Sequence, residues 1–422
     1  MENVEFNANR NFAQHLDLID PLNHFRNEFY IPYDDHGKEH IYFCGNSLGL
    51  QPKVTESYIL QELEDWRKWG VEGHFNARKP WMPYHEFLTE SMSKIVGAQH
   101  NEVVVMNSLT ANLHLMMVSF YKPTKKRFKI LMEENAFPSD QYAILSQVQF
   151  HGFDPKEAII EVKQKDNYSA IDENDILDII EKEGDSIALI LIGNVNYYTG
   201  QYFNIKKITE KGKEKGCKVG FDLAHGAGNL LLNLHQDAPD FAVWCSYKYL
   251  NSGPGNLSGC FIHESNASNT NLQRFAGWWG NDKSVRFQMR KDFNPIPTAE
   301  GWQLSNPPIF SLAAISASLS IFEKTSMKAL NAKSRKMTGY LEHLVRDIKS
   351  DKINILTPNE KGCQLSIQLK GTSKALFDSI TAEGVIADWR EPDVIRVAPV
   401  PLYNTFTEVY DFYEILKNCL QQ

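Results

Sequence analysis

Short apolar runs alternate with helical patterns through the first two thirds of the chain. Residues 187–192 and 241–245 are almost wholly apolar, as expected for parallel strands that are covered on both faces. Beyond Ser108, apolar residues recur at i, i+3, i+4 and i+7 from Leu113, so one face of a helix there is core. This alternation predicts an α/β fold with a mostly parallel sheet and right-handed crossovers. The predicted strands are 102–106, 128–132, 158–162, 187–192, 218–223, 241–245 and 257–263.

The pattern changes after residue 310. Residues 311–322 are small and apolar, and the helical pattern continues to about residue 349, which predicts one long helix joining two domains. Beyond it, strands and helices alternate as in a compact α+β domain. The segment 264–300 is aromatic and irregular, and it is long for a passive loop. The remaining predicted elements are helices 11–20, 54–69, 174–183, 375–383 and 406–420, and strands 41–44, 353–356, 363–369 and 394–397.

A chain of 422 residues is long enough for two domains with substantial cores. We expect residues 1–75 to form an N-terminal segment that packs on the small domain. Residues 76–310 should form the large domain, and residues 311–422 the linking helix with the small C-terminal domain.

Composition and charge narrow the function classes. The net charge of −8, from 44 basic and 52 acidic residues, argues against a nucleic-acid partner. The six cysteines form no CxxC pair, so we expect reduced thiols in a cytoplasmic protein and no metal site. The polar, acidic N-terminus is not a signal peptide, and no apolar run approaches the roughly 18 residues that span a membrane.

Two residues at strand ends indicate the chemistry. Lys248 follows the apolar run 241–245, and burial there favours the uncharged amine that Schiff-base chemistry needs. Alone, such a lysine more often extends into water. Asp222 ends an earlier run, where a helix cap is the ordinary reading. Together they match pyridoxal phosphate enzymes, which pair a Schiff-base lysine with an aspartate at the pyridinium nitrogen. Gly193, Asp222 and Lys248 all fall at the carboxyl ends of predicted strands, where such sheets bind ligands.

Several longer segments resemble the kynureninase family nearly end to end. They include FCGNSLGLQP (43–52), GHFNARKPW (73–81), NSLTANLHLMM (107–117), AFPSDQYA (136–143), DLAHG (222–226), WCSYKYLN (244–251) and IRVAPVPLYN (395–404). The resemblance implies fold type I of pyridoxal phosphate enzymes, pyridoxal 5'-phosphate as cofactor, and 76–310 as the cofactor-binding domain. It also implies a homodimer whose active sites are shared across the interface.

The resemblance assigns cofactor contacts residue by residue. It places Leu109 and Thr110 on the phosphate, which the N–H groups of a helix start also favour, with Ser108 or Thr110 as cap. It places Phe137 over the ring. It brings Trp278 and Asn306 from the partner subunit. The full set of implied cofactor residues is Leu109, Thr110, Phe137, Pro138, Ser139, Asp140, Gly193, Asp222, His225, Tyr247, Lys248, Trp278 and Asn306.

Three of these residues, His225, Tyr247 and Gly193, have more than one interpretation from the sequence. His225 orients Asp222 or the ring, or it is a structural histidine. Tyr247 binds phosphate or relays a proton, which would make it catalytic beside Lys248 and Asp222, or its hydroxyl is simply satisfied in the core. Gly193 stands where animal relatives commonly have Ser, so a side-chain contact is missing there and a backbone N–H is the expected substitute.

The resemblance also implies the substrate residues Asn46, Ser47, His74, Asn306 and Arg396. An arginine in an apolar strand needs an anionic partner, and for Arg396 this is either the substrate carboxylate or an internal salt bridge. In the family, His and Asn at the positions of His74 and Asn306 accompany a preference for 3-hydroxykynurenine.

The expected reaction is hydrolysis of L-kynurenine, or its 3-hydroxy form, to anthranilate or 3-hydroxyanthranilate and L-alanine. Such a hydrolase acts on a carbon–carbon bond in a ketone and serves tryptophan degradation and NAD biosynthesis. A cysteine desulfurase or aminotransferase of the same fold is the alternative enzyme. The desulfurase needs a mobile nucleophilic cysteine, whereas Cys363 begins an apolar strand. A non-catalytic scaffold is disfavoured because Asp222 and Lys248 are both intact.

Overall fold

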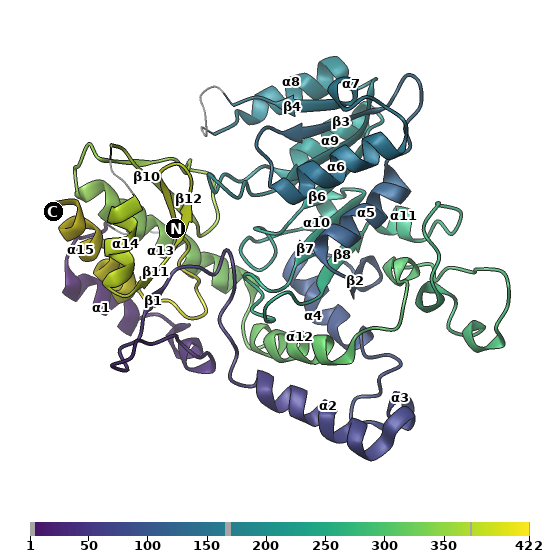
Figure 1. The fold of residues 1–422 in the computed structure, drawn as a ribbon, viewed down its shortest axis with the longest axis horizontal. Coiled ribbons are helices and arrows are strands. Elements are labelled where there is room, and N and C mark those ends of the chain that lie inside the picture. The colour runs from purple at the N-terminus through teal and green to yellow at the C-terminus, as the bar shows by residue number, and fades with distance from the viewer. Residues whose placement is uncertain (1–4, 165–169, 372–373, 422) are drawn as a thin grey trace.

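The computed structural model describes residues 5–164, 170–371 and 374–421. A seven-stranded sheet in the order β2-β8-β7-β6-β5-β3-β4 forms the centre of the larger part (Figure 1). β8 runs antiparallel to both of its neighbours, and the other pairings are parallel. The predicted mostly parallel sheet is therefore confirmed. Its strands are β2 Val103–Met106, β3 Lys129–Glu133, β4 Ile159–Val162, β5 Ile187–Gly193, β6 Lys218–Asp222, β7 Phe241–Cys245 and β8 Ser258–Ile262.

Helices cover both faces of this sheet, which is why its strands are apolar throughout. Along β5, Ile190 and Ile192 pack into one core, while Leu189 and Leu191 pack into another on the opposite face. One core contains residues of α4, α8, α9 and α12, and the other contains residues of α5 and α6. The helices of this part are α3 Gly73–Asn76, α4 Glu86–Val96, α5 Leu109–Phe120, α6 Pro138–Phe150, α7 Pro155–Ala158, α8 Glu173–Glu183, α9 Ile205–Glu214, α10 Leu234–Asp237, α11 Glu264–Ala267 and α12 Ile309–Phe322.

A smaller unit forms around a four-stranded antiparallel sheet in the order β12-β13-β10-β9, with a third core of its own. The predicted α+β C-terminal domain is therefore confirmed. Its elements are α13 Met327–Asp347, β9 Ile353–Ile355, β10 Leu365–Leu369, α14 Lys374–Ala382, β11 Val385–Ile386, β12 Asp388–Arg390, β13 Val394–Val397 and α15 Phe406–Gln421.

The N-terminal residues lie on this smaller unit. Helix α1 (Arg10–Leu18) packs against α15, and Arg10 pairs with Asp411 at 2.6 Å. Strand β1 (Ile41–Tyr42) pairs in parallel with β11, so the two ends of the chain share one body (Figure 1). Helix α2 (Thr55–Trp69) instead packs on α12. The division at residues 75 and 310 stays a prediction.

The predicted single helix through 311–349 is wrong. The structure has two helices, α12 and α13, with residues 323–326 between them. Ser326 adopts an extended conformation and its side chain accepts the N–H of Ala329, so it caps a new helix instead of continuing the old one. Ser108 also differs from expectation, because it occupies the cap position of α5 but its side chain makes no capping hydrogen bond.

The segment 264–300 is irregular, as predicted. It contains only α11 and short 3-10 turns. Two arginine side chains that stack on tryptophan rings stabilise it. The guanidinium of Arg274 lies 3.6 Å from the ring centre of Trp302, and that of Arg286 lies 4.5 Å from that of Trp279. No helix within the described residues is long and apolar enough to cross a membrane.

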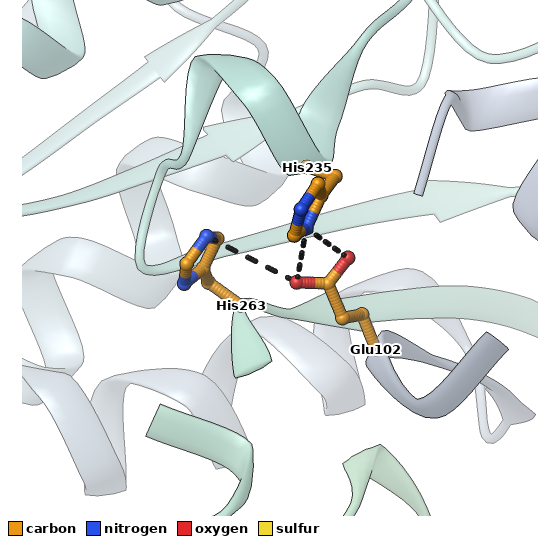
Figure 2. A group of neighbouring side chains, drawn as sticks. All are labelled: Glu102, His235 and His263. Carbon is orange, nitrogen blue, oxygen red and sulfur yellow. Dashed lines mark hydrogen bonds and ion pairs between the residues drawn. The ribbon is translucent and has the colours of Figure 1, made fainter. Parts of the chain in front are cut away.

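Glu102 joins three segments that are distant in sequence (Figure 2). Its buried carboxylate accepts the N–H of Gln99 at 2.8 Å and that of Glu264 at 2.9 Å, and lies 3.1 Å from Nδ1 of His235. His263 lies beside these two residues: one carboxylate oxygen of Glu102 and one ring nitrogen of each histidine lie within 4.8 Å of one another. The carboxylate already accepts hydrogen bonds from two backbone N–H groups. We therefore interpret the group as structural: it connects the start of β2 to α10 and α11.

Candidate active site

One cavity lies beyond the carboxyl ends of β3, β5, β6 and β7, as expected for a sheet of this kind. Its empty volume of about 540 Å³, open mouth included, is in the range of a small-molecule site. Ten of the cofactor residues implied by the resemblance line it: Leu109, Thr110, Phe137, Ser139, Asp140, Gly193, Asp222, His225, Tyr247 and Lys248. Glu133, Val195, Tyr197 and Ala224 also line it.

Lys248 lies just past β7, where the buried strand ends. Its Nζ is 3.1 Å from Nε2 of His225 and 5.8 Å from the ring centre of Phe137. Burial, and the charge of Lys248 after it, hold the pKa of His225 well below its ordinary value, so this imidazole is neutral. A neutral ring nitrogen accepts a hydrogen bond from the amine. The structure thus places His225 against Lys248, a contact that the sequence did not suggest.

Asp222 and Asp140 form a buried carboxyl pair. Burial raises the pKa of Asp222, and burial together with the charge of Asp222 raises that of Asp140 well above its ordinary value. A hydrogen bond joins the two groups, so they share a proton. One oxygen of Asp222 also accepts the N–H of Ala224 at 2.6 Å. Asp222 therefore serves the local turn and faces the cavity as well.

Glu133 is a cavity residue that sequence reasoning missed. It ends β3, is 3% exposed, and both its oxygens lie 3.2 Å from the N–H of Gly193. Burial raises the pKa of Glu133 to about 7. Its position in the sequence could have identified it. A charged residue at the end of a buried strand is the feature from which Asp222 and Lys248 were predicted to be site residues.

The contact with Glu133 changes the predicted role of the Gly193 backbone N–H. A Cβ at Gly193 would lie 3.0 Å from Oε1 of Glu133, which is closer than such contacts normally are. The backbone N–H expected to replace a side-chain contact with the cofactor donates to Glu133 instead. Gly193 lines the cavity, and its N–H is already used.

Two helix starts meet at the other end of the cavity. Oγ1 of Thr110, in the first turn of α5, lies 3.1 Å from Oγ of Ser139, in the first turn of α6. Neither helix start has a side-chain cap, so N–H groups of both first turns remain for an anion. Tyr247 also lines the cavity and is half-buried, and burial raises the pKa of its phenol. This end of the cavity suits a phosphate.

Arg396 on β13 is 1% exposed and internally paired in this structure. Its NH1 donates to the carbonyl of Tyr197 at 2.6 Å, and its NH2 contacts Asp388. Ser47 donates to Asp388 at 2.5 Å, and Asn46 is buried and donates to Gln364 at 3.1 Å. The predicted substrate residues Asn46, Ser47 and Arg396 thus lie in the contact region between the N-terminal segment and the smaller unit.

Seven residues implied by the resemblance do not line this cavity: Asn46, Ser47, His74, Pro138, Trp278, Asn306 and Arg396. Nδ1 of His74 lies 2.9 Å from the carbonyl of Val71. Trp278 is 40% exposed and its indole donates to the carbonyl of Arg286, while Asn306 is on the surface. Within one chain, His74, Trp278 and Asn306 therefore lie outside the lining of the cavity that contains Lys248.

Comparison with known proteins identifies close relatives. A family model described as "Kynureninase C-terminal domain" matches residues 330–416. The kynureninase of Myxococcus xanthus is 54% identical over 415 residues, covering 98% of this chain and 97% of that protein. The kynureninase of Koribacter versatilis is 51% identical over 98% of both chains. That of Nematostella vectensis is 48% identical over 97% of this chain and 93% of its own.

Solved structures share the fold at much lower identity. A cysteine desulfurase from Thermococcus onnurineus is 15% identical with a TM-score of 0.74, over 90% of this chain and 95% of that one. A cysteine desulfurase from Escherichia coli is 14% identical with a TM-score of 0.76, over 94% of this chain and 98% of that one. The architecture is therefore that of fold type I.

Proposed function

Because the chain belongs to the kynureninase family, we infer that it hydrolyses L-kynurenine, its 3-hydroxy form or both, with pyridoxal phosphate as its cofactor. The products are anthranilate or 3-hydroxyanthranilate, and L-alanine. The observation that carries this function is the contact of Lys248 with neutral His225, in a cavity that also holds the Asp140–Asp222 pair. That cavity belongs to a chain 54% identical to a kynureninase over nearly its whole length.

The described residues fit pyridoxal phosphate. Buried Oδ1 of Asp140 and Nδ1 of His225 have no hydrogen-bond partner among them. Glu133, Asp140 and Asp222 line the cavity with Lys248, and burial raises the pKa of all three carboxyl groups. A protonated pyridine nitrogen would stabilise the ionised form of Asp222. The two helix starts with the hydroxyl groups of Thr110 and Ser139 would hold the phosphate. When bound, the cofactor supplies an aldehyde that joins to an amine and a ring that takes up the electron pair of a broken Cα–H bond.

The residues of this chain divide the remaining work. In this proposal Lys248 moves the proton at the substrate Cα, and the contact of its amine with the neutral Nε2 of His225 orients that amine. Asp222 and Asp140 present a shared proton and negative charge at the end of β6. Arg396 binds the substrate α-carboxylate. Tyr247, beside Lys248, serves the phosphate or relays a proton.

We further propose a homodimer that completes each site. Trp278 and Asn306 do not line the cavity of their own chain, although Phe137, which does line it, is 42% exposed. Large apolar side chains are exposed on α2, α3, α4, the 264–300 segment and the start of α12, which is the mark of a protein interface. They are Trp66, Phe75, Phe87, Phe275, Trp278, Phe287, Met289 and Phe310. A second copy of this chain is the proposed occupant.

We place the enzyme in the cytoplasm and in tryptophan degradation leading to NAD. All six cysteines are free thiols, which supports a reducing compartment. The amino-acid substrate is a small molecule, and the net charge of −8 supports no nucleic-acid partner.

The deciding experiment offers the holoenzyme kynurenine, 3-hydroxykynurenine and cysteine, and identifies the products. We expect alanine with anthranilate or its hydroxy form, and no sulfide from cysteine. Cys363, the best desulfurase nucleophile in sequence, is fully buried, and burial raises the pKa of its thiol to about 12, so it is inert. Sulfide release without turnover of either kynurenine would contradict the function.

A further inference from the structure

Asp388, Arg390 and Arg396 form one charged cluster on the small sheet. Asp388 and Arg390 lie two residues apart on β12, and Asp388 lies directly opposite Arg396 on β13, so the three side chains share a face. One oxygen of Asp388 accepts from Ser47 at 2.5 Å and from Arg390 at 3.1 Å, and it also contacts NH2 of Arg396.

The cluster lacks one anion. Two guanidinium groups face one carboxylate. Burial acts to raise the pKa of Asp388, but the charges of Arg396 and Arg390 and the hydrogen bonds from Ser47 and Arg396 together outweigh burial, and the pKa is lowered. The Nε atoms of Arg390 and Arg396 are both buried, and neither has a hydrogen-bond partner among the described residues. A buried N–H donor without an acceptor is costly. A second carboxylate would neutralise the remaining positive charge and accept from these donors.

The cluster adjoins the cavity through Tyr197, and none of its own three residues is part of the cavity lining. Arg396 donates to the carbonyl of Tyr197, whose side chain lines the cavity with Lys248. The charges of Lys248, Arg396 and Arg390 all act on His225, which touches Lys248. The unfilled donors are therefore near the position where an amino-acid substrate joined through its amine would carry its carboxylate.

We propose that Arg390 binds the substrate α-carboxylate together with Arg396, and that Asp388 is the positioning residue that holds both guanidinium groups. This inference rests on the proposed function, since it names a further contact for the same amino-acid substrate. One bidentate arginine leaves a carboxylate two lone pairs, and a second arginine uses them.

The test compares two ligands that differ only in the carboxylate. Calorimetry measures binding of L-alanine and of L-alaninamide to the holoenzyme, for wild type and Arg390→Gln. Loss of a charge-assisted hydrogen bond should weaken L-alanine binding about 10- to 100-fold and change L-alaninamide binding by less than about twofold. An equal effect on both ligands, or no effect on L-alanine, would overturn the role of Arg390.

Matched variants separate binding from folding. Arg346→Gln removes an arginine that pairs with Glu342 at 2.7 Å on α13, outside the cavity, and should leave the ratio of the two affinities as in wild type. Arg390→Lys keeps the charge without the planar fork and should give an intermediate ratio. A Lys variant equal to wild type would show that geometry at residue 390 is irrelevant and would contradict the shared contact.

Asp388→Asn tests the positioning role by the sign of its effect. If Asp388 only cancels charge, its loss should tighten binding of L-alanine. If it holds the guanidinium groups, binding should weaken about tenfold, and the KM for kynurenine should rise by more than kcat falls. Tighter binding would refute the positioning role. These binding measurements do not depend on turnover, so a wild type that fails to hydrolyse kynurenine would contradict the proposed function alone.

Discussion

At the scale of single residues, the main feature of the cavity is that it contains three buried carboxyl groups and one lysine. Glu133, Asp140 and Asp222 are all buried, and Lys248 is the cation that faces them within the cavity lining. Burial disfavours the ionised form of a carboxyl group, so the pKa values of all three are raised. The protons held there make the cavity sensitive to pH before any ligand enters.

Removing Lys248 should abolish both turnover and the visible absorption of the enzyme. Lys248→Ala deletes the amine that we propose joins to the cofactor and moves the Cα proton. The residues on either side, Tyr247 and Tyr249, carry no amine that could take its place. The measurements are an absorption spectrum of the purified protein and a kynurenine assay. A folded variant that still converted kynurenine would remove Lys248 from the mechanism.

Glu133 should make the cofactor-free protein less stable as pH rises. Its pKa is raised from 4.5 to about 7, so the folded state holds a proton that the unfolded state releases. The stability it contributes is complete below about pH 4.5 and is lost as pH rises through about 7. Between pH 5 and pH 8 the wild type should lose about 2.5 kcal/mol more than Glu133→Gln.

Urea unfolding at the two pH values measures this difference. Glu134→Gln is the matched control, because the neighbouring carboxylate accepts the N–H of Gln164 and pairs with Lys163 at 3.0 Å, and both contacts lower its pKa. The same pH response in Glu133→Gln and wild type would mean that Glu133 is ionised throughout.

His74 and Asn306 should set the preference between the two kynurenines. Their side chains can hydrogen-bond a ring hydroxyl, and a site built for a hydroxyl discriminates against the analogue that lacks it. We expect a higher kcat/KM for 3-hydroxykynurenine in wild type. The double change His74→Trp with Asn306→Thr should shift the ratio towards kynurenine. The ratio of kcat/KM values in both proteins decides, and an unchanged ratio would exclude both residues from specificity.

At the scale of elements, a loop from the N-terminal segment supports the strand end that carries Lys248. The N–H of Gly49 donates to the carbonyl of Tyr247 at 2.8 Å. A Cβ at Gly49 would lie 2.3 Å from the carbonyl oxygen of Lys248 and 2.8 Å from Cα of Asn251. Backbone atoms cannot yield as a flexible side chain can, so the segment with Lys248 would have to move.

Gly49→Ala should therefore lower kcat/KM strongly, by about 100-fold, since displacements of about 1 Å at a reacting group have such effects. Gly339→Ala on α13 is the control, because its Cβ would meet Phe6 at an ordinary 3.4 Å. Kinetics and thermal unfolding of both variants are the measurements. A fully active Gly49→Ala enzyme would show that the loop and Lys248 move independently.

The elements also show what a sequence can and cannot reveal. Strands β5 and β7 were predictable because both faces are buried and their residues are apolar throughout. Strands β11 and β12 were missed because they are two and three residues long and carry little apolar pattern. The break between α12 and α13 depends on the capping hydrogen bond of Ser326, which competes with an otherwise continuous helical pattern.

The same contrast holds in the site. Lys248 and Asp222 follow apolar strands and have a chemistry that explains them, so position and residue type were enough. Glu133 occupies an equivalent position, but a glutamate at the end of a strand reads as a surface residue until its burial and its bonds to Gly193 are known. The pairing of Arg396 with Asp388 depends on the register between β12 and β13, which no local pattern encodes.

At the scale of the whole molecule, we propose that the site extends beyond one chain. If Trp278 and Asn306 act in the partner's cavity, two inactive variants should restore activity together. Lys248→Ala and the double variant Trp278→Ala with Asn306→Ala, co-expressed with different tags, should form heterodimers with one intact site. Random pairing gives about a quarter of the wild-type activity.

The controls are each variant expressed alone, and the heterodimer isolated through both tags. Sedimentation confirms that every sample is dimeric. Purified heterodimers no more active than the two parents would show that each site is complete within its own chain, and would withdraw the shared-site proposal.

The pairing of the two chain ends has a consequence for synthesis on the ribosome. Residues 10–42 emerge before their partners in β11 and α15, which are made more than 300 residues later. At about 5–20 residues per second, this segment waits roughly 15–70 s before it can dock. During that interval Phe25, Phe29 and Phe43, all buried in the finished fold, have no complete surface to cover them. A nascent chain stalled before residue 380 should therefore be cut by protease within its first 45 residues, while the central sheet is already resistant.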